Sequence, residues 1–335
     1  MTNIMKIWIC ILLAAAIFST QFTHLSAYDT QGDISCENDF SLCDSSAEPA
    51  SCASCPRFGA SVDFLWWQLR RPQSYTSKGF STSSDVTSFS RTEPEYVSFD
   101  YDPGFRVGLF AYDTCHCFDV GVIWTHFETH AKADKRVQLP EELFVELDVT
   151  RADASIKVRL NYVDLDFSKK LCLMPCFVVT PHIGVRGLWL DYHQRVRGVG
   201  FIEDFDTNRV ALRKQKFKDV GYGIEGGFWM QWNMNCGLSL VGHLGGSVLS
   251  IEDKYHSGRR VIQVDDTNVV TDDEIDLYKS AFKSGTTTFD YYIGLQYNYT
   301  VCGYDILFKA GWESFFVDFD SFHFQGLTTG LSVNF

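Results

Sequence analysis

The stretch Leu327–Phe335 reads LTTGLSVNF, and it decides the fold class. Counted back by twos from Phe335, the residues are apolar or threonine, and the residues between them are small or polar. A period of two residues is that of a β-strand whose two faces meet different surroundings. The sequence therefore predicts a last strand with one apolar face that finishes on an aromatic residue.

The first residues of the chain predict export. Lys6 precedes the apolar run Ile7–Phe18, and a polar stretch then closes on Leu25–Ala27. A positive charge, a short apolar core and a small residue in this order are typical of a secretory signal peptide, so we expect residues 1–27 to be removed. A retained membrane anchor is the less favoured alternative, because the apolar run is short for a membrane span.

The two ends together predict the compartment. An alternating last strand with a terminal aromatic residue resembles the signature of bacterial outer-membrane β-barrels. The resemblance implies that the barrel-assembly machinery recognises Phe335 as an assembly signal. No later segment offers about 18 uninterrupted apolar residues, so we expect no transmembrane helix. The predicted location is the bacterial cell outer membrane.

Period-two segments fill residues 58–335 and predict about ten strands. Their expected bounds are 58–69, 95–112, 118–130, 155–167, 177–195, 217–232, 238–252, 285–299, 305–315 and 324–335. The connections alternate between short turns, at 113–117, 169–176, 233–237 and 300–304, and longer loops, at 70–94, 131–154, 196–216, 254–284 and 316–323. Short turns on one side and long loops on the other are typical of outer-membrane barrels.

We therefore expect an all-β fold, a closed antiparallel transmembrane β-barrel with both termini on the periplasmic side. Closure is required because hydrocarbon cannot satisfy the hydrogen bonds of an open strand edge. Twelve strands are the alternative, if Phe144–Val149 or Arg260–Val264 forms a hairpin of its own.

The cysteines predict a disulfide framework at one rim. Residues 28–57 form a Cys-rich segment, expected to be a periplasmic extension, and the other cysteines after the signal peptide fall at or beside the short turns. The candidates are Cys36, Cys43, Cys52, Cys55, Cys115, Cys117, Cys172, Cys176, Cys236 and Cys302. Thiols pair in an oxidising compartment, although their connectivity cannot be deduced from sequence. Zinc ligation by Cys52 and Cys55 or by Cys115, His116 and Cys117 is less favoured, as is a redox role for Cys52 and Cys55, and we expect no metal centre.

The faces opposite the apolar ones carry mixed charges. The candidate lumen-lining residues are Asp63, Arg106, Lys157, Arg159, Arg186, Glu225, His243, Asp290, Gln296, Lys309 and Glu313. Such residues suit a water-filled pore, whose ion selectivity they would set. The alternative is a narrow barrel filled by its own side chains, in which the charges pair across the interior.

Other functions find less support. His126, Glu128 and His130 lie near the outer end of one strand, but no serine or aspartate is spaced to complete a triad, so we expect no enzyme and no cofactor. The acidic stretch Asp265–Asp276 lacks the spacing of an EF-hand and is interpreted as a solvated loop. A net charge of −13 disfavours nucleic acid as a partner.

Several short motifs carry a family resemblance. They are FGASVDFLWW at Phe58–Trp67, DPGFRVG at Asp102–Gly108, GYGIEGG at Gly221–Gly227, and LSL at Leu238–Leu240 leading into GGSVL at Gly245–Leu249. The chain resembles Legionella-type major outer membrane proteins and their cysteine-rich, chlamydial-type relatives. The resemblance implies a porin-like or structural barrel with disulfide cross-linking of the envelope. These motifs are structural and transfer no catalytic residues.

Two functions therefore remain open from the sequence. The favoured one is a porin-like channel for ions and small solutes with a disulfide-stabilised periplasmic rim. The alternative is a structural or adhesive envelope protein with a side-chain-filled barrel. The expected partners are outer-membrane lipid, the assembly machinery, and disulfide-linked copies or other Cys-rich envelope proteins.

Overall fold

The computed structural model describes an all-β chain. The described residues are 57–70, 74–78, 93–96, 98–113, 118–135, 148–174, 176–202, 207–235, 237–264, 270–301, 304–318 and 322–335. The strands are β1 Arg57–Arg70, β2 Ser74–Lys78, β3 Glu93–Tyr96, β4 Tyr101–Asp113, β5 Phe118–Lys135, β6 Asp148–Lys169, β7 Leu171–Met174, β8 Phe177–Ile202, β9 Thr207–Asn235, β10 Leu238–Val264, β11 Val270–Val301, β12 Tyr304–Val317 and β13 Phe322–Asn334. The predicted signal peptide and nearly all of the extension fall outside the described residues.

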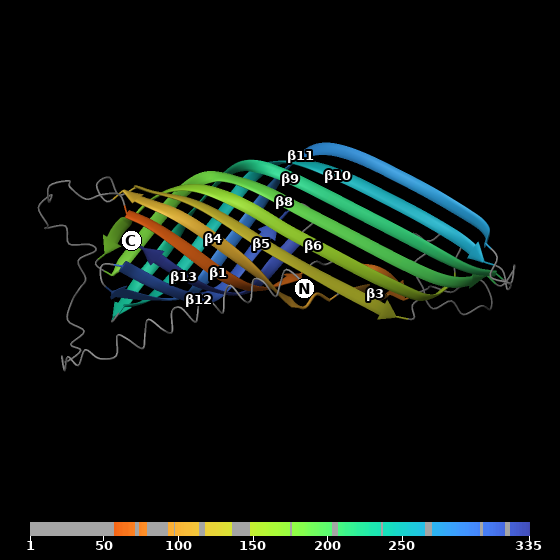
Figure 1. The fold of residues 1–335 in the computed structure, drawn as a ribbon, viewed down its shortest axis with the longest axis horizontal. Helices are drawn as coiled ribbons and strands as arrows, with labels where there is room; N and C mark the ends of the chain where they lie inside the picture. Colours follow the sequence, from red (N-terminus) through yellow and green to blue (C-terminus); the bar gives the residue numbers. More distant parts are fainter. Residues whose placement is uncertain are drawn as a thin grey trace, which may run out of the picture. The chain divides into compact units, whose positions relative to one another are not determined.

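Ten of these strands close into an antiparallel barrel in the order β1, β4, β5, β6, β8, β9, β10, β11, β12, β13 (Figure 1). The last strand pairs with the first from Gly59–Asn334 to Arg70–His323. The ladder continues to the terminus, where the backbone groups of Phe335 and Phe58 exchange hydrogen bonds of 2.8 and 2.9 Å. The predicted all-β fold, a closed antiparallel barrel, is therefore confirmed.

The prediction of ten strands is confirmed over the alternative of twelve. Arg260–Val264 does not form a separate hairpin but continues β10. The short strands β2 and β3 pair with each other inside the predicted loop 70–94, apart from the barrel sheet. The short β7 follows β6 and pairs only with β8.

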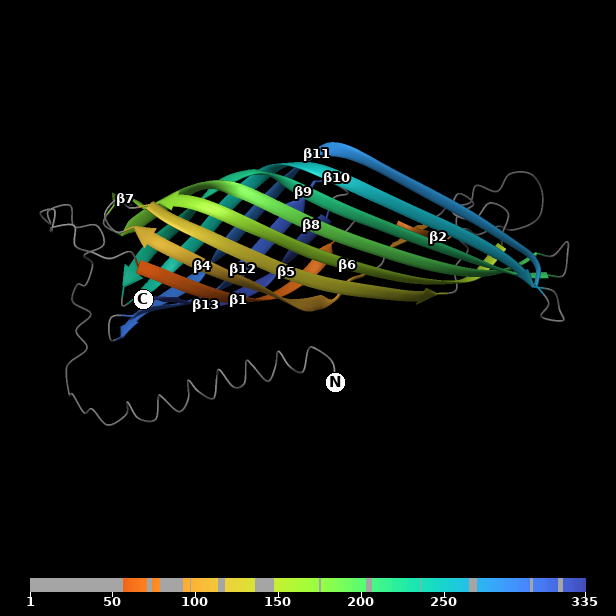
Figure 2. The same cartoon turned by 45° about the horizontal axis from the view of Figure 1, so that its top comes forward.

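The predicted loops 196–216 and 254–284 are wrong in extent, because most of their residues are strand. β8 and β9 stay paired up to Ile202 and Thr207, and β10 and β11 up to Val264 and Val270. In Figures 1 and 2 these long strands project well past the ends of β12 and β13. Their residues no longer alternate between apolar and polar, so the periodicity that predicts a strand fades while backbone pairing persists.

A continuous band of exposed apolar side chains surrounds the barrel. Every barrel strand contributes to it, among them Val62, Leu109, Val122, Phe167, Ile183, Ile224, Leu244, Ile293, Phe308 and Leu327. Aromatic residues mark its two rims: Trp66, Trp124, Trp189 and Trp312 on one side, and Phe58, Phe118, Trp232, Tyr299 and Phe335 on the other. An outward apolar band between aromatic girdles is the lipid-facing surface of a transmembrane barrel. No helix in the described part of the chain is long and apolar enough to cross a membrane.

The band can be tested with two isoleucines on one face of β11. Ile293 and Ile275 are both 57% exposed, but Ile293 lies within the band and Ile275 lies far beyond its rim. We expect Ile293→Arg to destabilise the folded barrel by about 2–4 kcal/mol, because arginine near the bilayer midplane loses its hydration. Ile275→Arg should change stability by less than about 0.5 kcal/mol. Urea unfolding in lipid vesicles measures both, and equal effects would exclude Ile293 from the bilayer.

Candidate functional site: the barrel interior

The interior beyond the band rim is an apolar core. Buried inward-facing side chains of seven strands fill it, including Leu65, Trp67, Leu69, Phe127, Val158, Leu160, Leu188, Leu190, Leu249, Phe315, Phe322 and Phe324. Their rings pack together; for example, the Phe127 ring lies 5.8 Å from that of Trp67 and 5.7 Å from that of Phe324. This part of the barrel is filled in the manner of a soluble protein.

The polarity of the strands inverts where this core begins. On β6, Ile156, Val158 and Leu160 are buried inside, whereas Lys157 and Arg159 lie on the outer face and pair with Glu128 at 2.6 and 2.8 Å. The expectation that Lys157 and Arg159 line the lumen is therefore wrong. A strand that has left the bilayer must turn its polar face to water and its apolar face to the core, so the rule that apolar residues face outward no longer holds.

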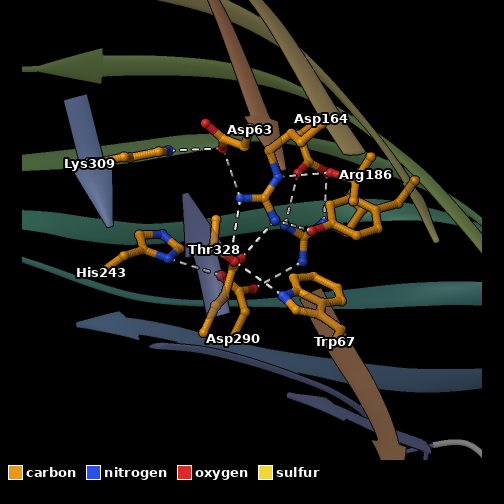
Figure 3. A network of polar contacts seen from close by, with 12 residues as sticks. Asp63, Trp67, Asp164, Arg186, His243, Asp290, Lys309 and Thr328 are labelled. Atoms are coloured by element: carbon orange, nitrogen blue, oxygen red, sulfur yellow. Dashed lines mark hydrogen bonds and ion pairs between the residues drawn. The ribbon is translucent and has the colours of Figure 1, made fainter. Parts of the chain in front are cut away.

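A network of ion pairs crosses the interior below the core, and Arg186 is one of its centres (Figure 3). The Arg186 guanidinium donates to Asp164 at 2.7 Å, and it pairs with Glu225 at 2.7 Å and Asp290 at 3.1 Å. It lies 5.0 Å from the ring centroid of Tyr162, a distance at which cation–π attraction acts. Arg186 is 6% exposed, so these contacts replace its hydration.

Arg106 forms the second centre of the network. Its guanidinium pairs with Glu313 at 2.7 Å and with Asp63 at 3.4 Å. The Lys309 ammonium also pairs with Asp63, at 2.9 Å. Thr328 donates to Glu313 at 2.7 Å, which ties the network to β13 and the barrel seam. Removing one member of such a buried network leaves its partners without a counter-charge.

A cavity of about 290 Å³ lies below the network, near the end that carries the short turns. Polar side chains line much of its wall: Tyr112, Lys170, Thr180, Gln231, Gln296, Lys309, Ser332 and Asn334. Lys309 both lines the cavity and joins the ion-pair network, so the network borders the cavity on one side.

The structure brings most of the predicted lumen residues together. Asp63, Arg106, Arg186, Glu225, His243, Asp290, Lys309 and Glu313 belong to the network, where His243 lies 3.0 Å from Asp290, and Gln296 lines the cavity. Their role in ion selectivity stays a prediction. Sequence reasoning missed Asp164, Tyr162 and Thr328. On β6, Leu165 and Phe167 face the lipid, so the residues that alternate with them face the interior. This alternation could have identified Asp164.

The residues considered for catalysis or metal binding lie apart from this site. Glu128 is on the outer face of β5, where partial burial would raise its pKa but hydrogen bonds from Lys157 and Arg159 outweigh this and lower it. His126 contacts Asn161 at 2.7 Å. Within the described ranges, no group of three or more His, Cys, Asp or Glu side chains could hold a metal ion.

Two of the disulfide candidates fall in the described residues. Cys172 of β7 is disulfide-bonded, and Cys176 in the following turn is a free, exposed thiol. The partner of Cys172 and the remaining candidate cysteines lie outside the described part of the chain.

A closed antiparallel ring with a lipid-facing apolar band and a polar, side-chain-filled interior defines an outer-membrane β-barrel. The chain belongs to the family described as the Legionella pneumophila major outer membrane protein precursor, whose model matches residues 51–332. This confirms the family resemblance and places the protein in the bacterial outer membrane. Among curated proteins, none matches the sequence significantly.

Several solved structures resemble the chain over most of its length. The outer membrane protease OmpT from Escherichia coli is 12% identical, with 83% of this chain and 96% of that chain covered and a TM-score of 0.40. A major outer membrane protein from Thermus thermophilus is 13% identical, with 84% and 100% covered and a TM-score of 0.31. A Pseudomonas aeruginosa FadL homologue is 8% identical, with 84% and 90% covered and a TM-score of 0.27.

The contribution of the network to the stability of the barrel can be measured by substituting Arg186. We expect Arg186→Ala to lower the free energy of unfolding by about 3–5 kcal/mol, because three carboxylates then stay buried without their shared cation. Arg57→Ala is the matched control, since Arg57 and Asp305 form an exposed pair at 3.6 Å that is worth at most about 1 kcal/mol. Urea titration followed by tryptophan fluorescence gives both values. A loss below about 1 kcal/mol at Arg186 would contradict the central role of the network.

Proposed function

We propose that this protein is a structural barrel of the outer membrane whose lumen is closed in its resting conformation, and that its function resides in its rim and outer surfaces. One observation carries the proposal. At the level of the core, inward side chains such as Leu65, Trp67, Phe127, Leu160 and Phe315 are 0% exposed. A water-filled passage would leave inward side chains accessible at every level, and a barrel of this strand number has a narrow interior to begin with.

The energetics of the interior support the same proposal. Opening a passage would require displacing the aromatic core and separating the pairs that Arg106 and Arg186 form with their carboxylates. Separating buried ion pairs leaves desolvated charges behind, which costs several kcal/mol for each partner left alone. The resting conformation is therefore expected to be closed at two levels, the apolar core and the ion-pair network.

The proposal assigns the cysteine-rich rim to cross-linking of the envelope. By the rule that short turns of outer-membrane barrels are periplasmic, both termini and the turn carrying Cys176 would face the periplasm. The free, exposed thiol of Cys176 is available to pair with another chain in that oxidising compartment. The proposal includes no catalytic role, because His126, Glu128 and His130 lie on the outer face of β5.

The second candidate is a porin-like channel for ions and small solutes. The observation in its favour is the charged interior with a cavity directly beside it. In the network the carboxylates Asp63, Asp164, Glu225, Asp290 and Glu313 outnumber the cations Arg106, Arg186 and Lys309. A channel opened through it would therefore prefer cations.

Single-channel recording in planar bilayers separates the two candidates. We expect the wild-type barrel to show no conductance steps. Steps should appear when Phe127→Ala and Phe324→Ala, which remove two packed rings of the core, are combined with Arg106→Ala and Arg186→Ala, which remove the cations of the second closed level. Arg159→Ala, on the outer face, is the matched control and should stay silent. Steps in the wild type whose cation preference falls in Glu225→Ala but not in Arg159→Ala would establish the channel instead.

Cross-linking through the rim gives a separate prediction. Outer membranes prepared with thiols blocked should contain disulfide-linked oligomers that collapse to monomer on reduction. Cys176→Ser should remove most of these oligomers without changing the folded fraction, since Cys176 makes no internal disulfide. Non-reducing electrophoresis measures the change. An oligomer pattern identical to that of the wild type would show that other cysteines carry the cross-links.

A further inference from the structure

The outer face of the sheet carries a dense basic patch just beyond the apolar band. This outer basic patch consists of His193 and Arg195 of β8, Lys214, Lys216 and Lys218 of β9, and Lys254 of β10. These residues alternate along their strands with inward-facing residues such as Tyr192 and Asp219, which are buried. All six therefore lie on one outer surface, in a chain whose net charge is −13.

The register of the strands sets like charges directly opposite one another in this patch. Lys214 is paired with Arg195 and Lys218 with Lys254, while Lys216 lies opposite His193. Like charges at directly opposed positions of neighbouring strands destabilise a sheet. This repulsion between like charges recurs across three adjacent strands, β8, β9 and β10. Its recurrence points to a bound anion that offsets the repulsion.

Internal counter-charges are few within the patch. Asp191 pairs with Lys218 at 3.8 Å and Glu252 with Lys254 at 3.1 Å, but Arg195, Lys214 and Lys216 form no ion pair with any described residue. Partial burial and the nearby charge of Lys216 hold the pKa of His193 below its ordinary value. The patch is thus a surface of unbalanced positive potential.

The position of the patch relative to the bilayer identifies the source of the anion. On the outer face of β9 the apolar band ends at Val220, opposite Trp189 of β8, and Lys218, Lys216 and Lys214 follow at successive outward positions. At about 3.3 Å rise per residue and a tilt of about 45°, these lysines lie roughly 5 to 14 Å beyond the apolar rim. Lipid headgroups occupy this height, with their acyl chains against the band below.

We propose that the outer basic patch binds the phosphate groups of a phosphorylated glycolipid, such as the lipopolysaccharide of the outer leaflet, while Trp189 and Val220 contact its acyl chains. The adjoining apolar band favours an amphipathic ligand over free phosphate, because only a lipid meets both surfaces at once. The assignment to the outer leaflet rests on the proposed orientation of the barrel; the binding itself does not.

The test measures lipid A binding to the full-length protein refolded in zwitterionic detergent micelles, where orientation plays no part. Lys214→Gln combined with Lys216→Gln removes two charges that form no ion pair with any described residue. As the control, Arg57→Gln combined with Lys169→Gln removes two exposed charges at the opposite end of the barrel. Each lysine near an anionic lipid surface contributes about fivefold in affinity, so the patch variant, which lacks two, should bind about 30-fold more weakly. The control should stay within about twofold of the wild type.

Both variants should retain wild-type thermal stability without lipid A, which separates loss of binding from loss of folding. The wild type should bind bisphosphorylated lipid A more tightly than its dephosphorylated form, and the difference should shrink in high salt. Equal binding of the two lipids, or an unchanged affinity in the patch variant, would overturn the proposal. A soluble sulfated polysaccharide that binds as tightly as lipid A would also overturn it and assign the patch to a polyanion in solution.

Discussion

Hydrocarbon offers no hydrogen-bond partner to a peptide group, so a strand inside a bilayer must find its partners in neighbouring strands. The ring closed by β1 and β13 meets this constraint with an unbroken ladder that reaches the backbone of Phe335. Once the ring is closed, the alternation of each strand decides the rest, because one set of side chains faces lipid and the other fills a narrow interior. Polar groups caught inside have only each other as partners, and the pairs of Arg106 and Arg186 are the consequence.

The same constraint explains why the long strands change character along their length. Within the bilayer the solvent around the barrel is apolar, and beyond the rim it is water, while the hydrogen-bond ladder continues through both. On β8 the outer face passes from Trp189 to Asp191, and on β9 from Val220 to Lys218, at the same register positions. The inner face changes in the opposite sense, from the ion pairs of Arg186 to the buried Leu188 and Leu190. A single strand therefore carries a membrane pattern and a soluble pattern in succession.

This succession marks what could be predicted from the sequence. The alternation of apolar and polar residues is strong in the segments that face lipid. Ten strands and a final barrel strand that runs up to Phe335 can therefore be predicted from the sequence. A period of two residues does not say which face is outside. For 155–167 the apolarity of a face predicts that it points outward, and this rule holds only within the bilayer. The ends of β8 to β11 were missed because their outer faces are polar and their pattern is weak. The partners in the network were beyond reach, since Arg106 and Glu313 are 207 residues apart and meet only across the closed ring.

The apolar core and the ion-pair network are not independent levels of the interior, and Tyr162 is one of the residues that join them. Its hydroxyl oxygen accepts a hydrogen bond from Arg106 at 2.9 Å, and its ring lies 5.0 Å from the Arg186 guanidinium. The same ring stacks on Phe315 of the apolar core at 5.0 Å. Displacing the core thus disturbs both arginines, and separating the ion pairs leaves Tyr162 without the partner of its buried hydroxyl. A single side chain swinging aside would not open this barrel, because any passage requires the core and the network to rearrange together.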